Sequence, residues 1–231
     1  MEDGPTYGFD TLQIHAGSRP DPVTGARQTP IYQSTAYVFR DAEHAAALFN
    51  LQEVGYIYSR LTNPTVSVLQ ERIATLEGGV GAVCCSSGHA AQIMALFPLM
   101  TPGCNVIAST RLYGGTVTQF NQTIKRFGWS AKFVDFDDLD ALENAIDENT
   151  RAIFCEAIAN PGGYITDLQA ISSISDKAGL PLIVDNTTAT PYLCRPIEYG
   201  ATLVVHSTTK YMTGNGTVTG GCIVDSGKFD W

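Results

Sequence analysis

The stretch that decides the fold is Leu203-Val204-Val205-His206-Ser207-Thr208-Thr209-Lys210, where an unbroken apolar run gives way to hydroxyl side chains and one lysine. Other mainly apolar runs occupy residues 81–85, 105–109, 131–134, 152–158, 182–184 and 221–224. Such runs, without alternation, are typical of strands buried on both faces. Helical patterns lie between them, such as Leu139, Leu142 and Ile146. Alternating strands and helices predict the α/β class, with a mostly parallel sheet sandwiched by helices.

Residues 1–60 differ in character from the rest of the chain. They carry turn-forming runs such as Arg19-Pro20-Asp21-Pro22 and Thr29-Pro30, and they show little periodicity. Proline and glycine at this density interrupt helices and strands. The regular pattern starts near Asn63, so we predict an extended N-terminal arm over 1–60 and one large domain over 61–231.

Composition and charge narrow the class of protein. Hydrophobic residues make up 44% of the chain and charged residues 16%, as in a globular protein with a substantial core. A net charge of −9 argues against nucleic acid as the main partner. No apolar run approaches the length of a membrane span, and the first five residues predict no signal peptide.

The cysteines and histidines carry information about compartment and metals. The six cysteines form no Cys-x-x-Cys pair, and most lie in apolar runs. Reduced thiols in a cytoplasmic protein are therefore the favoured interpretation, with zinc the weaker alternative. The four histidines are scattered without ligand spacing, so we expect no metal site.

Two polar residues at the ends of apolar runs predict the chemistry. Lys210 comes just after one run, and burial there would lower its pKa and free the amine as a nucleophile. Asp185 ends another run and could hold a proton on a heterocycle. Lysine and aspartate are the two protein groups that pyridoxal phosphate (PLP) requires. Ser207 and Thr209 add hydroxyl groups of the kind that hold a phosphate.

The run Ser86-Ser87-Gly88-His89 follows an apolar run and opens a helix. The free N–H groups of a helix start suit a phosphate. The alternative is an ordinary helix cap by Ser86 or Ser87, and taken alone this alternative is favoured. Ser87, Asp185 and Ser207 nevertheless all lie where strands end, and ligands of open α/β sheets bind there. This convergence favours a ligand site.

Four further residues have two interpretations each. Tyr113 could stack on a planar cofactor and transfer protons, although a tyrosine beside glycines is more often a loop anchor. Asn160 could contact a ring hydroxyl, and a turn residue before Pro161 is about equally favoured. Arg60 with Tyr58 could clamp an anion. Spacing alone favours a surface arginine beside a helix start.

Together these motifs resemble the cysteine/methionine-metabolism family of PLP enzymes, which contains cystathionine γ-synthase, methionine γ-lyase and O-acetylhomoserine sulfhydrylase. The resemblance is closest to the sulfhydrylase branch, and it runs in family order along the chain. The stretches that carry it are Tyr58-Ser59-Arg60-Leu61-Thr62-Asn63-Pro64-Thr65, Ser86-Ser87-Gly88-His89, Leu112-Tyr113-Gly114-Gly115-Thr116, Val184-Asp185-Asn186-Thr187 and Ser207-Thr208-Thr209-Lys210.

The resemblance implies a fold and an activity. The fold would be the aspartate aminotransferase-like large domain of PLP-dependent transferases, and the family's smaller C-terminal substrate domain is absent from this chain. The reaction would be γ-replacement in methionine and cysteine biosynthesis, converting O-acetylhomoserine and sulfide to homocysteine and acetate. The alternatives are cystathionine γ-synthase or methionine γ-lyase activity, or a truncated chain that binds PLP without turnover.

The resemblance also implies roles for individual residues. Lys210 would bind the cofactor covalently and move protons, Asp185 would pair with the pyridine nitrogen, and Tyr113 would stack on the ring and assist proton transfer. Tyr58 and Arg60 would reach the phosphate of a neighbouring subunit, which implies a homo-oligomer, a dimer of dimers. The other residues expected to contact the cofactor are Ser87, Gly88, His89, Asn160, Thr187, Ser207 and Thr209.

Overall fold

The computed structural model describes residues 7–231. The chain divides into two compact units, an N-terminal unit (Met1–Ile73) and a sheet unit (Ala74–Trp231). The division falls within helix α3 (Pro64–Glu77), so the last residues of this helix belong to the sheet unit.

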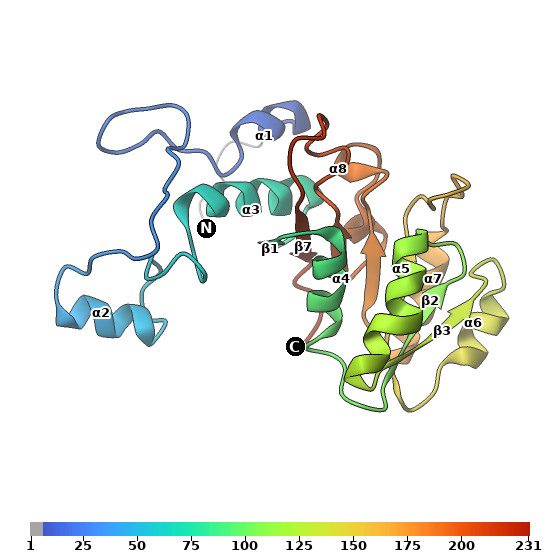
Figure 1. The fold of residues 1–231 in the computed structure, drawn as a ribbon. Coiled ribbons are helices and arrows are strands. Elements are labelled where there is room, and N and C mark those ends of the chain that lie inside the picture. Colours follow the sequence, from blue (N-terminus) through green and yellow to red (C-terminus); the bar gives the residue numbers. More distant parts are fainter. Residues whose placement is uncertain (1–6) are drawn as a thin grey trace. The chain divides into compact units, whose positions relative to one another are not determined.

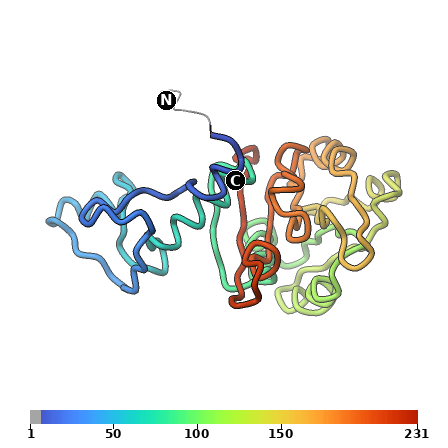
Figure 2. The backbone as a smooth tube through the Cα atoms, turned by 90° about the horizontal axis from the view of Figure 1, so that it is seen from above, coloured from blue at the N-terminus to red at the C-terminus, as the bar shows by residue number. Residues whose placement is uncertain are grey.

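Before α3, the described residues of the N-terminal unit hold two short helices in otherwise irregular backbone (Figure 2). Helix α1 (Phe9–His15) buries none of its residues, and α2 (Ala42–Phe49) buries only Leu48. Large hydrophobic side chains remain exposed on this unit, including Val23, Ile31, Val38, Leu51 and Val54. The extended arm over 1–60 stays a prediction; its described residues form two short helices joined by irregular backbone.

The sheet unit is built on a seven-stranded sheet with the order β1-β7-β6-β5-β4-β2-β3 (Figure 1). The strands are β1 (Gly81–Cys85), β2 (Asn105–Ser109), β3 (Ser130–Val134), β4 (Thr150–Glu156), β5 (Leu182–Asp185), β6 (Leu203–His206) and β7 (Gly221–Asp225). Neighbours are parallel from β6 through β5, β4 and β2 to β3, whereas β7 is antiparallel to both β1 and β6. The predicted mostly parallel α/β sheet is confirmed.

Helices cover the sheet, as the apolar runs predict. Every residue of β2, β5 and β6 is buried, which requires cover on both faces. On one face, Leu96 and Phe120 pack with alternate strand residues such as Val106, Ile183 and Val205. The helices are α4 (Gly88–Leu96), α5 (Gly114–Thr118), α6 (Leu139–Ala145), α7 (Leu168–Ala178) and α8 (Thr190–Leu193), with a π-helical turn (Gln119–Thr123) and 3-10 turns (Ile124–Phe127 and Pro196–Tyr199).

Among residues 7–231, no helix is both long and apolar enough to cross a membrane. No group of three or more histidine, cysteine, aspartate or glutamate side chains within these residues is arranged to hold a metal ion.

Candidate active site

The carboxyl ends of three neighbouring strands bring polar residues together. Glu156 at the end of β4 is the register partner of Asp185 at the end of β5, and Asp185 is the partner of Val205 in β6. The chain continues from these ends into the segments that carry Asn160, Thr187 and Ser207. These strand ends therefore lie at one edge of the sheet, where ligands of open α/β sheets bind.

The backbone at Gly88 packs closely against Ser207. A Cβ atom added at Gly88 would lie 2.7 Å from Ser207 Cβ and 3.0 Å from Ser207 Cα, so only glycine permits the start of α4 to approach the Ser207 backbone. Thr187 Oγ1 accepts a hydrogen bond from Ser207 N–H at 2.7 Å. The first residues after β1, β5 and β6 thus form one cradle.

The start of α4 combines a cap with free donors. Ser87 Oγ accepts a hydrogen bond from Ala90 N–H at 3.1 Å, so the ordinary helix cap considered from the sequence is present. The N–H groups of Gly88 and His89 precede that bond and have no carbonyl within the helix to bind. They are the donors that a phosphate would use at a helix start.

The carboxylate of Asp185 is held by two hydrogen bonds. Oδ1 accepts from Thr187 N–H at 3.0 Å, and Oδ2 accepts from Gln92 Nε2 at 3.1 Å. Gln92 is buried in α4 and also donates to Thr116 Oγ1 at 3.0 Å. Each carboxylate oxygen retains a lone pair, so Asp185 can still accept a bond from a cofactor nitrogen. The sequence analysis did not identify Gln92.

Lys210 lies in a turn after β6 and is exposed, so the burial predicted for this lysine is wrong. The turn is set by the hydrogen bond from Lys210 N–H to Ser207 O at 3.2 Å and by the bond from Gly214 N–H to Lys210 O at 2.8 Å. Strand β6 ends four residues before Lys210. The lysine side chain therefore lies outside the buried layer of the sheet.

Tyr113 precedes α5 and faces His89 across Gly115. The two ring centroids lie 6.1 Å apart. A Cβ atom at Gly115 would lie 2.5 Å from Tyr113 Cε1 and 2.8 Å from His89 Cε1, so a side chain there would displace a ring. The Tyr113 side chain is 47% exposed and is available to stack on a planar ligand.

Residues 10–231 match the family model of the Cys/Met metabolism PLP-dependent enzymes. The chain belongs to this family. It is 51% identical to a homocysteine synthase of Schizosaccharomyces pombe and 50% identical to an O-acetyl-L-homoserine sulfhydrylase of Corynebacterium glutamicum, over 96% and 97% of its length. It covers 52% of each relative, so it spans about half the length of these proteins.

Solved structures of PLP-dependent enzymes also resemble this chain. A chain described as an O-acetylhomoserine (thiol)-lyase of Campylobacter jejuni is 44% identical and superposes with a TM-score of 0.93, over 96% of this chain and 55% of that one. That structure carries a pyridoxyl-lysine phosphate. A cystathionine gamma-lyase of Lactobacillus plantarum is 36% identical, with a TM-score of 0.86, over 95% of this chain and 55% of that one.

The residues of this PLP-family chain fit the cofactor. The start of α4, which packs closely against Ser207 at Gly88, offers N–H donors for a phosphate, and Asp185 offers a carboxylate for a pyridinium nitrogen. The hydroxyl group of Thr209, which was expected to contact the phosphate, is instead bonded to the Gly220 backbone. It accepts from Gly220 N–H at 2.9 Å and donates to Gly220 O at 3.2 Å. Its role toward the phosphate stays a prediction.

A buried carboxyl group that the sequence analysis missed ends β4. Glu156 Oε1 accepts from Tyr113 N–H at 2.6 Å, and Oε2 accepts from Asn160 N–H at 2.9 Å. Burial raises the pKa of Glu156 to about 7, and the charge of Asp185 adds to the rise, while the two N–H bonds oppose it. A single acidic residue closing the run Ile153-Phe154-Cys155-Glu156 was the available signal.

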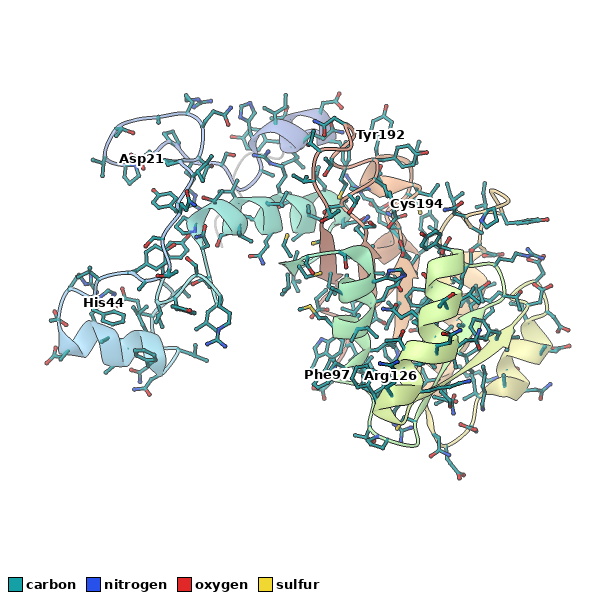
Figure 3. All side chains as sticks on the ribbon, viewed as in Figure 1. Asp21, His44, Phe97, Arg126, Tyr192 and Cys194 are labelled. Carbon is teal, nitrogen blue, oxygen red and sulfur yellow. The ribbon has the colours of Figure 1, made fainter. Side chains whose placement is uncertain are left out.

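A second buried network lies beneath the cradle. Glu77 Oε1 lies 2.6 Å from His206 Nε2 and accepts from Asn186 Nδ2 at 2.9 Å. Asn186 also donates to Cys194 O at 2.8 Å; Cys194, labelled in Figure 3, follows α8. Glu77, Asn186 and His206 are essentially inaccessible to solvent. This network ties the residues next to Asp185 and Ser207 to the end of α3.

Tyr58 and Arg60 belong to the N-terminal unit. Both are exposed, and Arg60 Cζ lies 5.5 Å from the centroid of the Tyr58 ring. Their action on a neighbouring subunit stays a prediction.

Proposed function

We propose that the chain is the cofactor-binding part of a PLP-dependent γ-replacement enzyme that converts O-acetylhomoserine and sulfide to homocysteine and acetate. The observation that carries the proposal is the cradle, in which Gly88 packs against Ser207 and Thr187 is bonded to both Asp185 and Ser207. Lys210 follows this cradle, and its backbone N–H donates to Ser207 O. The cradle occurs in a chain 50% identical to an O-acetyl-L-homoserine sulfhydrylase. The activity is a proposal for the whole protein, since this chain spans about half of that relative.

Lys210, Asp185 and Tyr113 each have a proposed task. Bound PLP supplies an electron sink for an amino-acid substrate. The Lys210 amine holds the cofactor and carries protons between substrate carbons. Asp185 keeps a proton on the pyridine nitrogen. Tyr113 covers the ring and assists proton transfer to the leaving acetate.

The remaining cofactor contacts surround the phosphate and the ring hydroxyl. The N–H groups of Gly88 and His89 bind the phosphate, with hydroxyl groups from nearby residues. Asn160 contacts the ring hydroxyl. The hydroxyl groups proposed to contact the phosphate are those of Ser207 and Thr209, and Thr209 must exchange its bond to Gly220 O in order to donate. Ser87 and Thr187 are the other proposed cofactor contacts.

The N-terminal arm, residues 1–60, is proposed to contact a neighbouring subunit in a homotetramer. Its exposed hydrophobic side chains, such as Val38 and Val54, are surface that a second copy would cover. Tyr58 and Arg60 would then reach the neighbour's phosphate. Light scattering should give the mass of four chains, and a monomer at micromolar concentration would contradict this arrangement. We further propose that the enzyme works in the cytoplasm, where its free thiols stay reduced.

γ-Elimination is the second candidate activity. It is supported by the likeness to a cystathionine gamma-lyase at a TM-score of 0.86. Assays of the protein at its natural length with O-acetylhomoserine and sulfide, and separately with cystathionine or methionine, distinguish the two. Release of a keto acid without added sulfide would favour elimination.

Borohydride trapping tests the proposal directly. The wild-type protein should be yellow with PLP, lose the colour on borohydride treatment and carry the label on Lys210. Lys210→Ala should lose both the label and turnover, because the covalent link and the proton carrier vanish together. Lys177→Ala, which removes a lysine paired with Glu143 on the surface, is the control and should retain both. Full turnover by Lys210→Ala would refute the mechanism.

A further inference from the structure

Glu156 occupies an unusual place for an acidic residue. It ends β4, is 5% exposed and has no lysine, arginine or histidine within ion-pair distance among residues 7–231. Asp185, its register partner on β5, is also acidic. Burying a carboxyl group beside a second one costs free energy, so the arrangement requires a compensating contribution.

The compensation comes from two backbone donors. Tyr113 N–H lies 2.6 Å from one carboxyl oxygen and Asn160 N–H lies 2.9 Å from the other. Tyr113 follows β2 and Asn160 follows β4, so one side chain joins two loops from different strands. Hydrogen bonds to a carboxylate are among the stronger ones in proteins.

Both loops carry residues proposed to contact the cofactor. The Tyr113 ring is further confined against His89 by the narrow space over Gly115. Glu156 therefore holds the Tyr113 backbone, and His89 with Gly115 restricts the space of its ring. Asn160 is fixed at its N–H, next to the side chain proposed to contact the ring hydroxyl.

We propose that Glu156 is a positioning residue that bridges the Tyr113 and Asn160 loops and so sets the two side chains proposed to contact the PLP ring and its hydroxyl group. The inference rests on the proposed function, because it concerns the same cofactor site. Glu156 itself touches neither cofactor nor substrate and acts through the two backbones. Only a side chain with two acceptor oxygens at this reach satisfies both N–H groups.

Three variants test the role in the protein at its natural length. Glu156→Gln keeps the size but turns an NH2 group toward one of the two N–H donors. Glu156→Asp keeps the charge but is one methylene shorter, so it reaches one loop and not both. Glu143→Gln, an exposed glutamate on α6 paired with Lys177, measures the effect of the same exchange away from the site.

The measurements are the dissociation constant for PLP and the visible circular dichroism of the bound cofactor. Glu156→Gln should bind PLP about tenfold more weakly, the size expected from losing one hydrogen bond to a charged group. Its dichroism band should change, because the ring is held at a different tilt. The borohydride label should still map to Lys210. Glu143→Gln should match the wild type in all three measurements.

A double-mutant cycle separates positioning from general stability. If Glu156 acts through the two loops, the effects of Glu156→Gln and Tyr113→Ala on PLP affinity should be less than additive. Additive effects, or wild-type affinity and dichroism in Glu156→Gln, would overturn the proposal. Should Glu156→Gln not fold, Glu156→Asp decides by the same criteria. A wild-type protein that takes up no PLP would instead defeat the proposed function itself.

Discussion

Replacing Gly88 by alanine should damage the sheet unit and the cofactor cradle together. The new Cβ atom would lie 2.7 Å from Ser207 Cβ and 3.2 Å from Ser207 N, so the start of α4 or the Ser207 backbone must shift. Overpacking of this kind costs about 1–3 kcal/mol. Alanine in a helix recovers at most about 1 kcal/mol. We expect a net loss of about 1–2 kcal/mol in the free energy of unfolding.

Urea unfolding of the PLP-free protein measures this loss. Gly114→Ala is the matched control, because Gly114 is the first residue of α5 as Gly88 is of α4, and an added Cβ atom there meets nothing within 4 Å. The control should be unchanged or slightly more stable. PLP titration of Gly88→Ala should also show weaker binding, since the shift moves the N–H donors. Equal stabilities for the two variants would refute the packing argument.

Three further predictions concern groups buried near the site. The pKa of Glu156 is raised by burial from 4.5 to about 7, so its contribution to stability is present below pH 4.5 and is lost as pH rises toward 7. Between pH 4.5 and 8, the free energy of unfolding of the PLP-free wild type should therefore fall by roughly 3 kcal/mol relative to that of Glu156→Gln. Urea unfolding at several pH values measures both proteins. A difference that stays constant with pH would contradict the prediction. Glu77→Ala should destabilise the protein by about 3–5 kcal/mol, because His206 and Asn186 lose a buried partner, whereas Glu143→Ala on the surface should change stability by less than about 1 kcal/mol. Cys84 Sγ lies 4.0 Å from Cys222 Sγ on paired strands. Diamide should therefore oxidise this pair to a disulfide by taking up the two thiol hydrogens. If maleimide still labels both Cys84 and Cys222 after this treatment, the prediction is wrong.

The strands could be predicted because their signal is local. The run at 182–184 and the stretch at 203–205 became β5 and β6, since unbroken apolar residues must be covered on both faces. The direction of β7 could not be predicted, because an apolar run looks the same in a parallel and an antiparallel strand. The run predicted to 158 ends as a strand at Glu156, where the side chain turns to two backbone N–H groups.

The candidate site residues were predictable where their signal is local. Asp185 ends one apolar run and Ser207 comes just after another, and their roles toward a cofactor stay predictions. Gln92 and Glu77 were missed because their partners, Asp185 and His206, are 93 and 129 residues away in sequence. The exposure of Lys210 could not be predicted from the apolar run before it, because a turn separates this residue from the buried strand β6.

The bonds of the Thr209 hydroxyl group control how the segment that carries Lys210 opens. The two bonds of this hydroxyl group to Gly220 close residues 210–219 into a loop whose base is pinned next to Lys210. Breaking these two bonds, together with the bond from Thr209 N–H to Gly220 O at 3.4 Å, would free the loop while the ladders of β6 and β7 stay intact, so opening is a local event with its own free energy. Hydrogen exchange at Gly220 N–H therefore reports how often the lysine segment detaches from the sheet.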